Sequence, residues 1–118
     1  MINMGVENIR IAVATKGHKG IEDTVSDIFG RAKTFTIVDV HEGVIQNVEV
    51  LQNPAASQKQ GVGPIVTRML GEASVNIVAA GEVGPGASTL LEIYKIKKIS
   101  VKPGIEVAEA IKNVLQEI

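Results

Sequence analysis

The chain has 118 residues, a formal net charge of −1 at pH 7, 45% hydrophobic residues and no cysteine. This length fits one domain over residues 1–118, and the lack of cysteine excludes disulfides, thiolate-bound zinc and all-cysteine iron–sulfur clusters. The scattered charges offer no basic surface to nucleic acid, and no apolar run reaches the roughly 20 residues of a membrane span. The start of the chain lacks the pattern of a secretory signal, so we expect a cytoplasmic protein.

The first half of the sequence predicts three strands. Apolar and small residues alternate over 8–15, β-branched and aromatic residues fill 34–40, and a further alternation covers 44–51. Residues 41–43 have the length and composition of a tight hairpin turn, so the second and third strands should be antiparallel neighbours. Residues 21–29 have helix-like apolar spacing but favour caps and turns, so we expect one short irregular turn there.

The second half predicts helices that alternate with strands. The helices are expected over 64–71 (or to 73), 85–94 and 104–118, and the strands over 75–80 and 98–101. On the last helix, the residues expected to face the core are Val107, Ala108, Ile111, Val114, Leu115 and Ile118. Right-handed crossovers make the last two strands parallel to a central strand. The expected fold is therefore α/β, a five-stranded mixed sheet in the order 3-2-1-4-5 with flanking helices.

Three loops leave the carboxyl ends of predicted strands, which is where ligands bind in sheets of this kind. They cover residues 16–20, 53–63 and 81–86. Two of them lead into helix starts, whose free amides and partial positive charge suit an anion. Glycines in these loops let a ligand approach the backbone closely, although a tight strand-to-helix connection without a ligand gives the same pattern.

Two side chains near these loops have alternative interpretations. Arg31 precedes the second strand, where its planar guanidinium can clamp an anionic ligand or pair with Asp23 or Asp27. His18 lies in the first loop as the candidate metal ligand, or is simply solvated. We expect His41 to lie elsewhere, in the hairpin turn.

Several segments, taken together, resemble one family. They are Ile9 to Thr15, Ser26-Asp27-Ile28-Phe29-Gly30-Arg31-Ala32, Asn53-Pro54, the Gly61/Gly63 loop and Gly81-Glu82-Val83-Gly84-Pro85-Gly86-Ala87. At this spacing the chain resembles the dinitrogenase iron–molybdenum cofactor biosynthesis family from about Ile9 to Leu115. The resemblance implies a ribonuclease-H-like fold. Its nitrogenase members carry or insert an iron–molybdenum cofactor or its precursor.

The chain departs from this family at the expected ligand positions. Members usually read Ser-x-His-Phe-Gly-Arg-Ala, and that histidine is a plausible cluster ligand, whereas this chain has Ile28 there. Many members also carry histidines after the Asn-Pro pair, where residues 55–60 here contain none. Carboxylates at Glu22, Asp23 and Glu82 would favour harder metals. The expected ligand-binding residues are His18, Gly30, Arg31, Asn53, Gly61, Gly63, Gly81, Glu82, Gly84 and Gly86.

Three functions remain open. The first is a small binding or accessory protein for an anionic ligand, which the resemblance suggests is a transiently bound iron–sulfur or iron–molybdenum type cluster. The second is an enzyme, which we do not expect: a nuclease needs clustered carboxylates, and Asp39 stands alone on the central strands. Neither histidine sits with a nucleophile and an acid. The third is a ligand-free interaction or regulatory module, a monomer or weak homodimer whose aliphatic strand 44–51 can pair with a partner.

Overall fold

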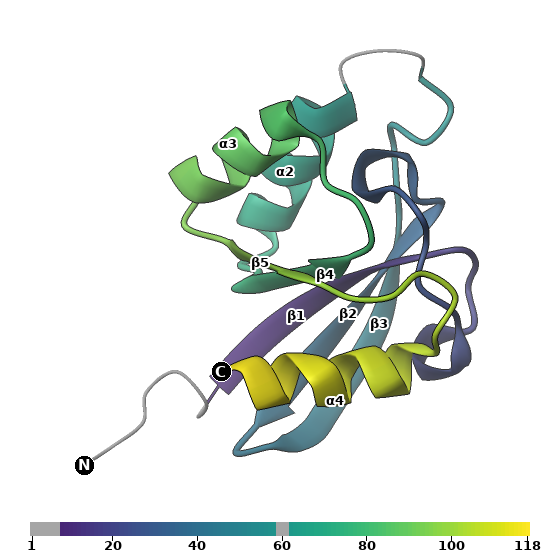
Figure 1. The fold of residues 1–118 in the computed structure, drawn as a ribbon, viewed down its shortest axis with the longest axis vertical. Helices are drawn as coiled ribbons and strands as arrows, with labels where there is room; N and C mark the ends of the chain where they lie inside the picture. The colour runs from purple at the N-terminus through teal and green to yellow at the C-terminus, as the bar shows by residue number, and fades with distance from the viewer. Residues whose placement is uncertain (1–7, 59–61) are drawn as a thin grey trace.

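The computed structural model describes residues 8–58 and 62–118, which form a five-stranded sheet between two layers of helices (Figure 1). The strands are β1 (Asn8–Thr15), β2 (Thr34–His41), β3 (Val44–Gln52), β4 (Ile77–Ala80) and β5 (Lys97–Ser100). β1, β2 and β3 form an antiparallel meander, while β4 lies parallel to β1 and β5 parallel to β4. The order β3-β2-β1-β4-β5 confirms the predicted mixed sheet. The ribonuclease-H-like assignment stays a prediction.

The helices divide between the two faces of the sheet. α2 (Val62–Glu72) and α3 (Pro85–Ile93) lie side by side on one face, and α4 (Val107–Glu117) covers the other (Figure 1). Within residues 8–58 and 62–118, no helix combines the length and the hydropathy of a membrane-spanning segment.

Each sheet face buries its own aliphatic cluster because successive strand residues point to opposite sides. Ala12 and Ala14 of β1 point toward α2 and α3, where their small size leaves room for Phe29 and Phe35. These two rings pack edge to face with their centroids 5.4 Å apart. On the opposite face, the larger apolar residues of β1 pack against α4.

Two expectations were wrong in detail: which alanine of α4 is buried, and which residues form the hairpin turn. On α4, Ala108 is exposed and Ala110 is buried instead, because Ala110 shares the helix face of Val107, Ile111 and Val114. The hairpin turn consists of Glu42 and Gly43, whose φ angles of 51° and 81° are the positive values of a type I′ turn. His41 therefore ends β2 and does not lie in the turn.

Residues 20–31 form two 3₁₀ turns rather than the single turn expected. The turns are Gly20–Glu22 and Phe29–Arg31. The chain between them is extended and makes isolated bridges to Thr15, Glu82 and Glu106. This segment thus crosses the carboxyl edge of the sheet, where the candidate site lies.

Candidate functional site

The crevice between the carboxyl ends of β1 and β4, where the strand order reverses, is the expected ligand position in such a sheet. Here the extended segment fills it. The Ser26 amide donates to the Ala14 carbonyl at 2.8 Å, and the Glu82 amide donates to the Asp27 carbonyl at 2.9 Å. The Glu82 carbonyl accepts from the Phe29 amide at 2.8 Å. The Glu82 backbone is therefore engaged within the protein and unavailable to a ligand.

Gly81 allows this closure. A Cβ atom on Gly81 would lie 2.7 Å from the Asp27 carbonyl oxygen and 2.8 Å from the Pro103 ring, so only glycine permits the approach. The structure places Gly81 and Glu82 in the closure of the crevice, and Gly81 also lines a separate hollow of about 230 Å³ beside β5.

A pocket of about 360 Å³ opens beside the filled crevice, at the starts of α2 and α3. Three chain segments line it: the turn before β2, the first turn of α2, and the first turns of α3. Its residues are Ile28, Gly30, Arg31, Val62, Gly63, Pro64, Gly84, Gly86, Ala87 and Leu90. The structure thus brings together Gly30, Arg31, Gly63, Gly84 and Gly86 from the predicted set.

Gly30 lets the turn before β2 approach the start of α2, and Gly63 lies beside the start of α3. A Cβ atom on Gly30 would lie 2.9 Å from Cγ2 of Val62, which is closer than side chains normally approach. A Cβ atom on Gly63 would lie 3.6 Å from the Cβ of Ala87, in ordinary contact. The backbones of both helix starts are therefore near one another and form one wall of the pocket.

The pocket is electropositive because helices begin at it. Gly84 is the N-cap of α3 and makes no side-chain capping bond, and Pro85 follows it. The Ser88 amide donates to the Gly84 carbonyl at 2.9 Å, so the Gly86 and Ala87 amides precede the first intrahelical bond. These amides, with the start of α2 nearby, favour a negatively charged occupant.

Arg31 contributes a cation at the pocket wall. Its Nη1 donates to the carbonyl of Gln58, which ties the turn before β2 to the loop that follows β3. Asp23, one of its expected partners, is buried and accepts hydrogen bonds from the amides of Lys19 and Thr24 at 3.0 and 2.7 Å. Asp23 therefore organises the loop after β1.

Asn53 acts behind the pocket rather than in it. Its side chain is buried, and its Nδ2 donates to the carbonyls of Gly30 and Ala32 at 3.2 and 2.8 Å. Its Oδ1 accepts from the Ala55 amide at 2.8 Å. Asn53 thus holds in place the turn that carries Gly30 and Arg31.

His18 lies away from the pocket. Its side chain is exposed, and its Nε2 hydrogen-bonds Oε1 of Gln52 at 2.8 Å. Sequence reasoning missed the anchor of this loop, in which the buried hydroxyls of Thr15 and Thr34 lie 2.6 Å apart and Thr34 donates to the Gly17 carbonyl. Thr15, Thr34 and Thr36 share one sheet face near the strand ends. This grouping can be seen in the sequence and could have indicated the anchor.

The structure does not test Gly61, and it places His41 away from the candidate loops, as expected. Gly61 lies outside the residues that the structure describes. His41 lies at the opposite end of the sheet, where its Nδ1 is 2.9 Å from Oδ1 of Asn8.

The apolar wall of the pocket was not anticipated. Ile28 is 46% exposed, and Val62, Pro64, Ala87 and Leu90 complete the wall. Leu90 follows Ala87 by three residues, which is the helical spacing that could have indicated a shared face. Among the described lining residues there is no histidine, cysteine or carboxylate, and the described part of the chain holds no group of three such residues that could bind a metal.

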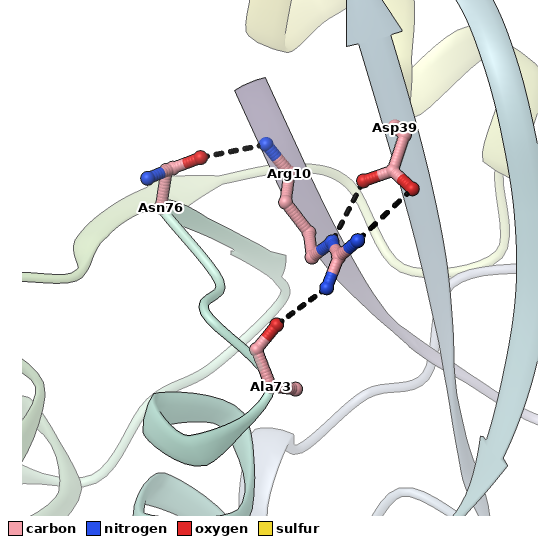
Figure 2. A network of polar contacts seen from close by, with 4 residues as sticks. All are labelled: Arg10, Asp39, Ala73 and Asn76. Carbon is pink, nitrogen blue, oxygen red and sulfur yellow. Dashed lines mark hydrogen bonds and ion pairs between the residues drawn. The ribbon is translucent and has the colours of Figure 1, made fainter. Parts of the chain in front are cut away.

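A second hollow of about 520 Å³ lies at the amino end of β1. Figure 2 shows the Arg10 guanidinium there, where Nε and Nη2 donate to the Asp39 carboxylate at 2.7 and 3.2 Å. Nη1 donates to the Ala73 carbonyl at 2.7 Å. The hydrogen bond to Asp39 raises the pKa of Arg10, against the opposing effect of burial. These contacts tie the end of α2 to the sheet, which indicates a structural role.

Comparisons with known proteins identify one family and similar folds. The family described as "Dinitrogenase iron-molybdenum cofactor" matches residues 7–117. The chain is similar to the apo form of the orange protein from Desulfovibrio gigas, with 28% identity, a TM-score of 0.82 and coverage of 92% of this chain and 88% of that chain. It is similar to a Thermotoga protein described as a "putative NifB protein", with 33% identity, a TM-score of 0.75 and coverage of 92% of this chain and 88% of that chain.

A relative in Methanocaldococcus jannaschii, described as an uncharacterized protein, shares 29% identity over 82 residues, which cover 65% of this chain and 70% of that protein. The motif resemblance and the family match thus agree over nearly the whole length. The chain belongs to the dinitrogenase iron-molybdenum cofactor family.

Proposed function

We propose that this protein is a small accessory protein that binds an anionic metallocluster, or another small anionic ligand, at the starts of α2 and α3. The observation that carries the proposal is the 360 Å³ pocket onto which two helix starts and Arg31 converge. Amides at a helix start bind anions through direct hydrogen bonds and through the helix dipole. The name of the family, which refers to an iron-molybdenum cofactor, and the description of the orange protein structure as an apo form support a cofactor-binding role.

The donor set of the pocket limits how such a cargo is held. Its described lining offers no thiolate, imidazole or carboxylate, and Ile28 occupies the position where family members usually carry histidine. A cluster that needs a protein ligand at that position does not fit. A cargo that brings a complete set of its own ligands fits better, since the pocket offers it amides, a guanidinium and an apolar wall.

We further propose that the protein is non-catalytic, cytoplasmic and without a nucleic-acid partner. The supporting observation is that the described residues place no group of three or more titratable metal-binding side chains together. Such a group, with a positioned base, is what metal-assisted hydrolysis of nucleic acid requires. Incubation with labelled DNA or RNA in magnesium or manganese tests this part, and cleavage would contradict it.

Anaerobic reconstitution with iron, sulfide and molybdate tests the binding itself. A coloured species that coelutes with the protein, with molybdenum and iron measured by mass spectrometry, is the expected result. Gly86→Asp is the informative variant: a Cβ on Gly86 meets no atom within 4 Å, and the new carboxylate would face the anion. We expect it to lower loading at least about tenfold by charge repulsion.

Ala108→Asp is the matched control, since Ala108 is exposed and holds the same second position in α4 that Gly86 holds in α3. Aspartate in a first helical turn is stabilising by about 0.3–1 kcal/mol, so both variants should stay folded. Equal loading of both variants would place the ligand elsewhere. No loading of the wild type would favour the ligand-free module, which the hydrogen-bonded closure at Glu82 also favours.

A further inference from the structure

The outer edge of β3 is a long strand edge without a neighbour in the described part of the chain. β3 has nine residues, pairs only with β2 in the sheet order, and none of its residues is buried. The opposite edge is different, because β5 has four residues and two of them are the lysines Lys97 and Lys98. Lysines on an edge strand discourage pairing with another chain. Of the two edge strands, only β5 therefore carries lysines that protect it.

The composition of β3 suits a copy of itself. Glu49 is its one charged residue, and its other polar residues are amides, which both donate and accept hydrogen bonds. Val44 and Ile45 are 58% and 41% exposed, among the most exposed large apolar residues described. We propose that β3 pairs antiparallel with β3 of a second copy about a two-fold axis, which makes a weak homodimer with one continuous sheet.

Charge selects the register of this pairing. When the two-fold axis is normal to the sheet, the residues that lie opposite one another on the two β3 strands point to the same face. The axis must therefore lie between one residue of β3 and the same residue of the second copy. An axis at Glu49 would oppose two carboxylates, which is destabilising. An axis at Val48 instead places each Asn47 amide opposite the partner subunit's Glu49. This contact then occurs twice.

A bulge limits the strength of the dimer. Asp39 pairs with Asn47 and Val40 with Ile45, so Gln46 has no opposite residue on β2. A bulge kinks an edge strand and shortens the stretch that pairs regularly. The regular part of the interface therefore centres on Asn47, Val48 and Glu49, which is why we infer a weak rather than an obligate dimer.

Charge changes at Asn47 test both the dimer and its register. In sedimentation equilibrium over a concentration series, Asn47→Lys should raise the association constant by about tenfold, because two new lysine–glutamate pairs form. Asn47→Glu should lower it by a similar factor, because carboxylates then oppose one another. Asn113→Lys and Asn113→Glu make the same charge changes on the outer surface of α4 and should leave association unchanged.

A second measurement locates the interface. Hydrogen exchange of the β3 amides should slow as protein concentration rises, while exchange at β5 stays constant. A wild-type chain and an Asn47→Lys variant that both remain monomeric at the highest soluble concentration would overturn the proposal and leave this edge to a different partner. Equal shifts from the Asn47 and Asn113 variants would overturn it as well. Neither result depends on ligand loading at the pocket.

Discussion

Glu82 and Asp27 close the carboxyl edge of the sheet, since the Glu82 amide donates to the Asp27 carbonyl at 2.9 Å across the ends of β1 and β4. Ligands of doubly wound sheets commonly bind at this point. In this chain the bond fills the position with backbone, and the pocket lies beside it at the starts of α2 and α3. The closure and the pocket can be tested separately because different glycines serve each.

Gly81→Ala should destabilise the fold, and Gly86→Ala should not. A Cβ on Gly81 would lie 2.7 Å from the Asp27 carbonyl oxygen, so the backbone must shift. We expect a loss of about 1–3 kcal/mol in the free energy of unfolding, measured in urea. At Gly86 no atom lies within 4 Å of the added Cβ, so this variant serves as the control. Equal stabilities of the two variants would show that the closure is loose.

Asn53→Ala should weaken both the fold and the pocket. The substitution removes the donors to the Gly30 and Ala32 carbonyls and the acceptor for the Ala55 amide, all in a buried position. Leaving such groups unpaired costs about 1–3 kcal/mol. We expect that loss in the free energy of unfolding, with lower ligand loading under conditions where the variant is still folded. Asn113→Ala on α4 should change stability by less than about 0.5 kcal/mol. Full loading in folded Asn53→Ala would show that Gly30 needs no support.

The sheet order followed from local sequence patterns, whereas the availability of the site did not. Alternating apolar residues gave β1, β2 and β3, a short turn joined the last two, and right-handed crossovers placed β4 and β5. Four of the loop glycines, Gly30, Gly63, Gly84 and Gly86, line the pocket, and their role in binding stays a prediction. The closure depends on the path of residues 23–29 across the sheet edge. Local sequence spacing does not predict which backbone amides a distant segment will hydrogen-bond.

The burial of individual residues also could not be predicted from the local sequence pattern. Ala108 and Ala110 are identical side chains two positions apart on α4, and only the docking of the helix decides which one is buried. Ile28 is a similar case, because its exposure at the pocket depends on its bridge to Glu82 rather than on its hydrophobicity.

The Arg10–Asp39 pair should contribute measurable coupling to stability. A double-mutant cycle with Arg10→Met and Asp39→Asn should give about 1 kcal/mol, since the contact is bidentate and partly shielded from solvent. The exposed pair Arg68–Glu72, with its Nε and Oε2 at 3.1 Å, is the control and should give about 0.3–0.5 kcal/mol. If the coupling energy is no larger than that of Arg68–Glu72, the contribution of Arg10 to stability comes from its hydrogen bond to the Ala73 carbonyl.

The contribution of the Arg10 charge to the free energy of unfolding should not vary with pH across the neutral and moderately alkaline range. The hydrogen bond to Asp39 raises the pKa of Arg10. A group whose pKa is raised on folding stabilises the protein below its unfolded pKa and loses that contribution only as pH rises through the folded value. Stability measured between neutral pH and about pH 11 should therefore show no step from this group. A step in this range that Arg10→Met abolishes would contradict the raised pKa.

Ile28→His should convert the pocket into a metal-coordinating one. Ile28 is 46% exposed and lines the pocket, so the imidazole can enter without disturbing the core, at a stability cost of about 1 kcal/mol or less. Above about pH 7 the neutral ring binds divalent copper. In amide spectra of the apo protein, copper should then broaden the Gly63 and Gly86 signals. Ile93→His, at a 67% exposed position at the other end of α3, should broaden signals there instead. Equal broadening of the pocket in the wild type would show that other residues already coordinate metal, and the proposed capture of cargo without protein ligands would then fail.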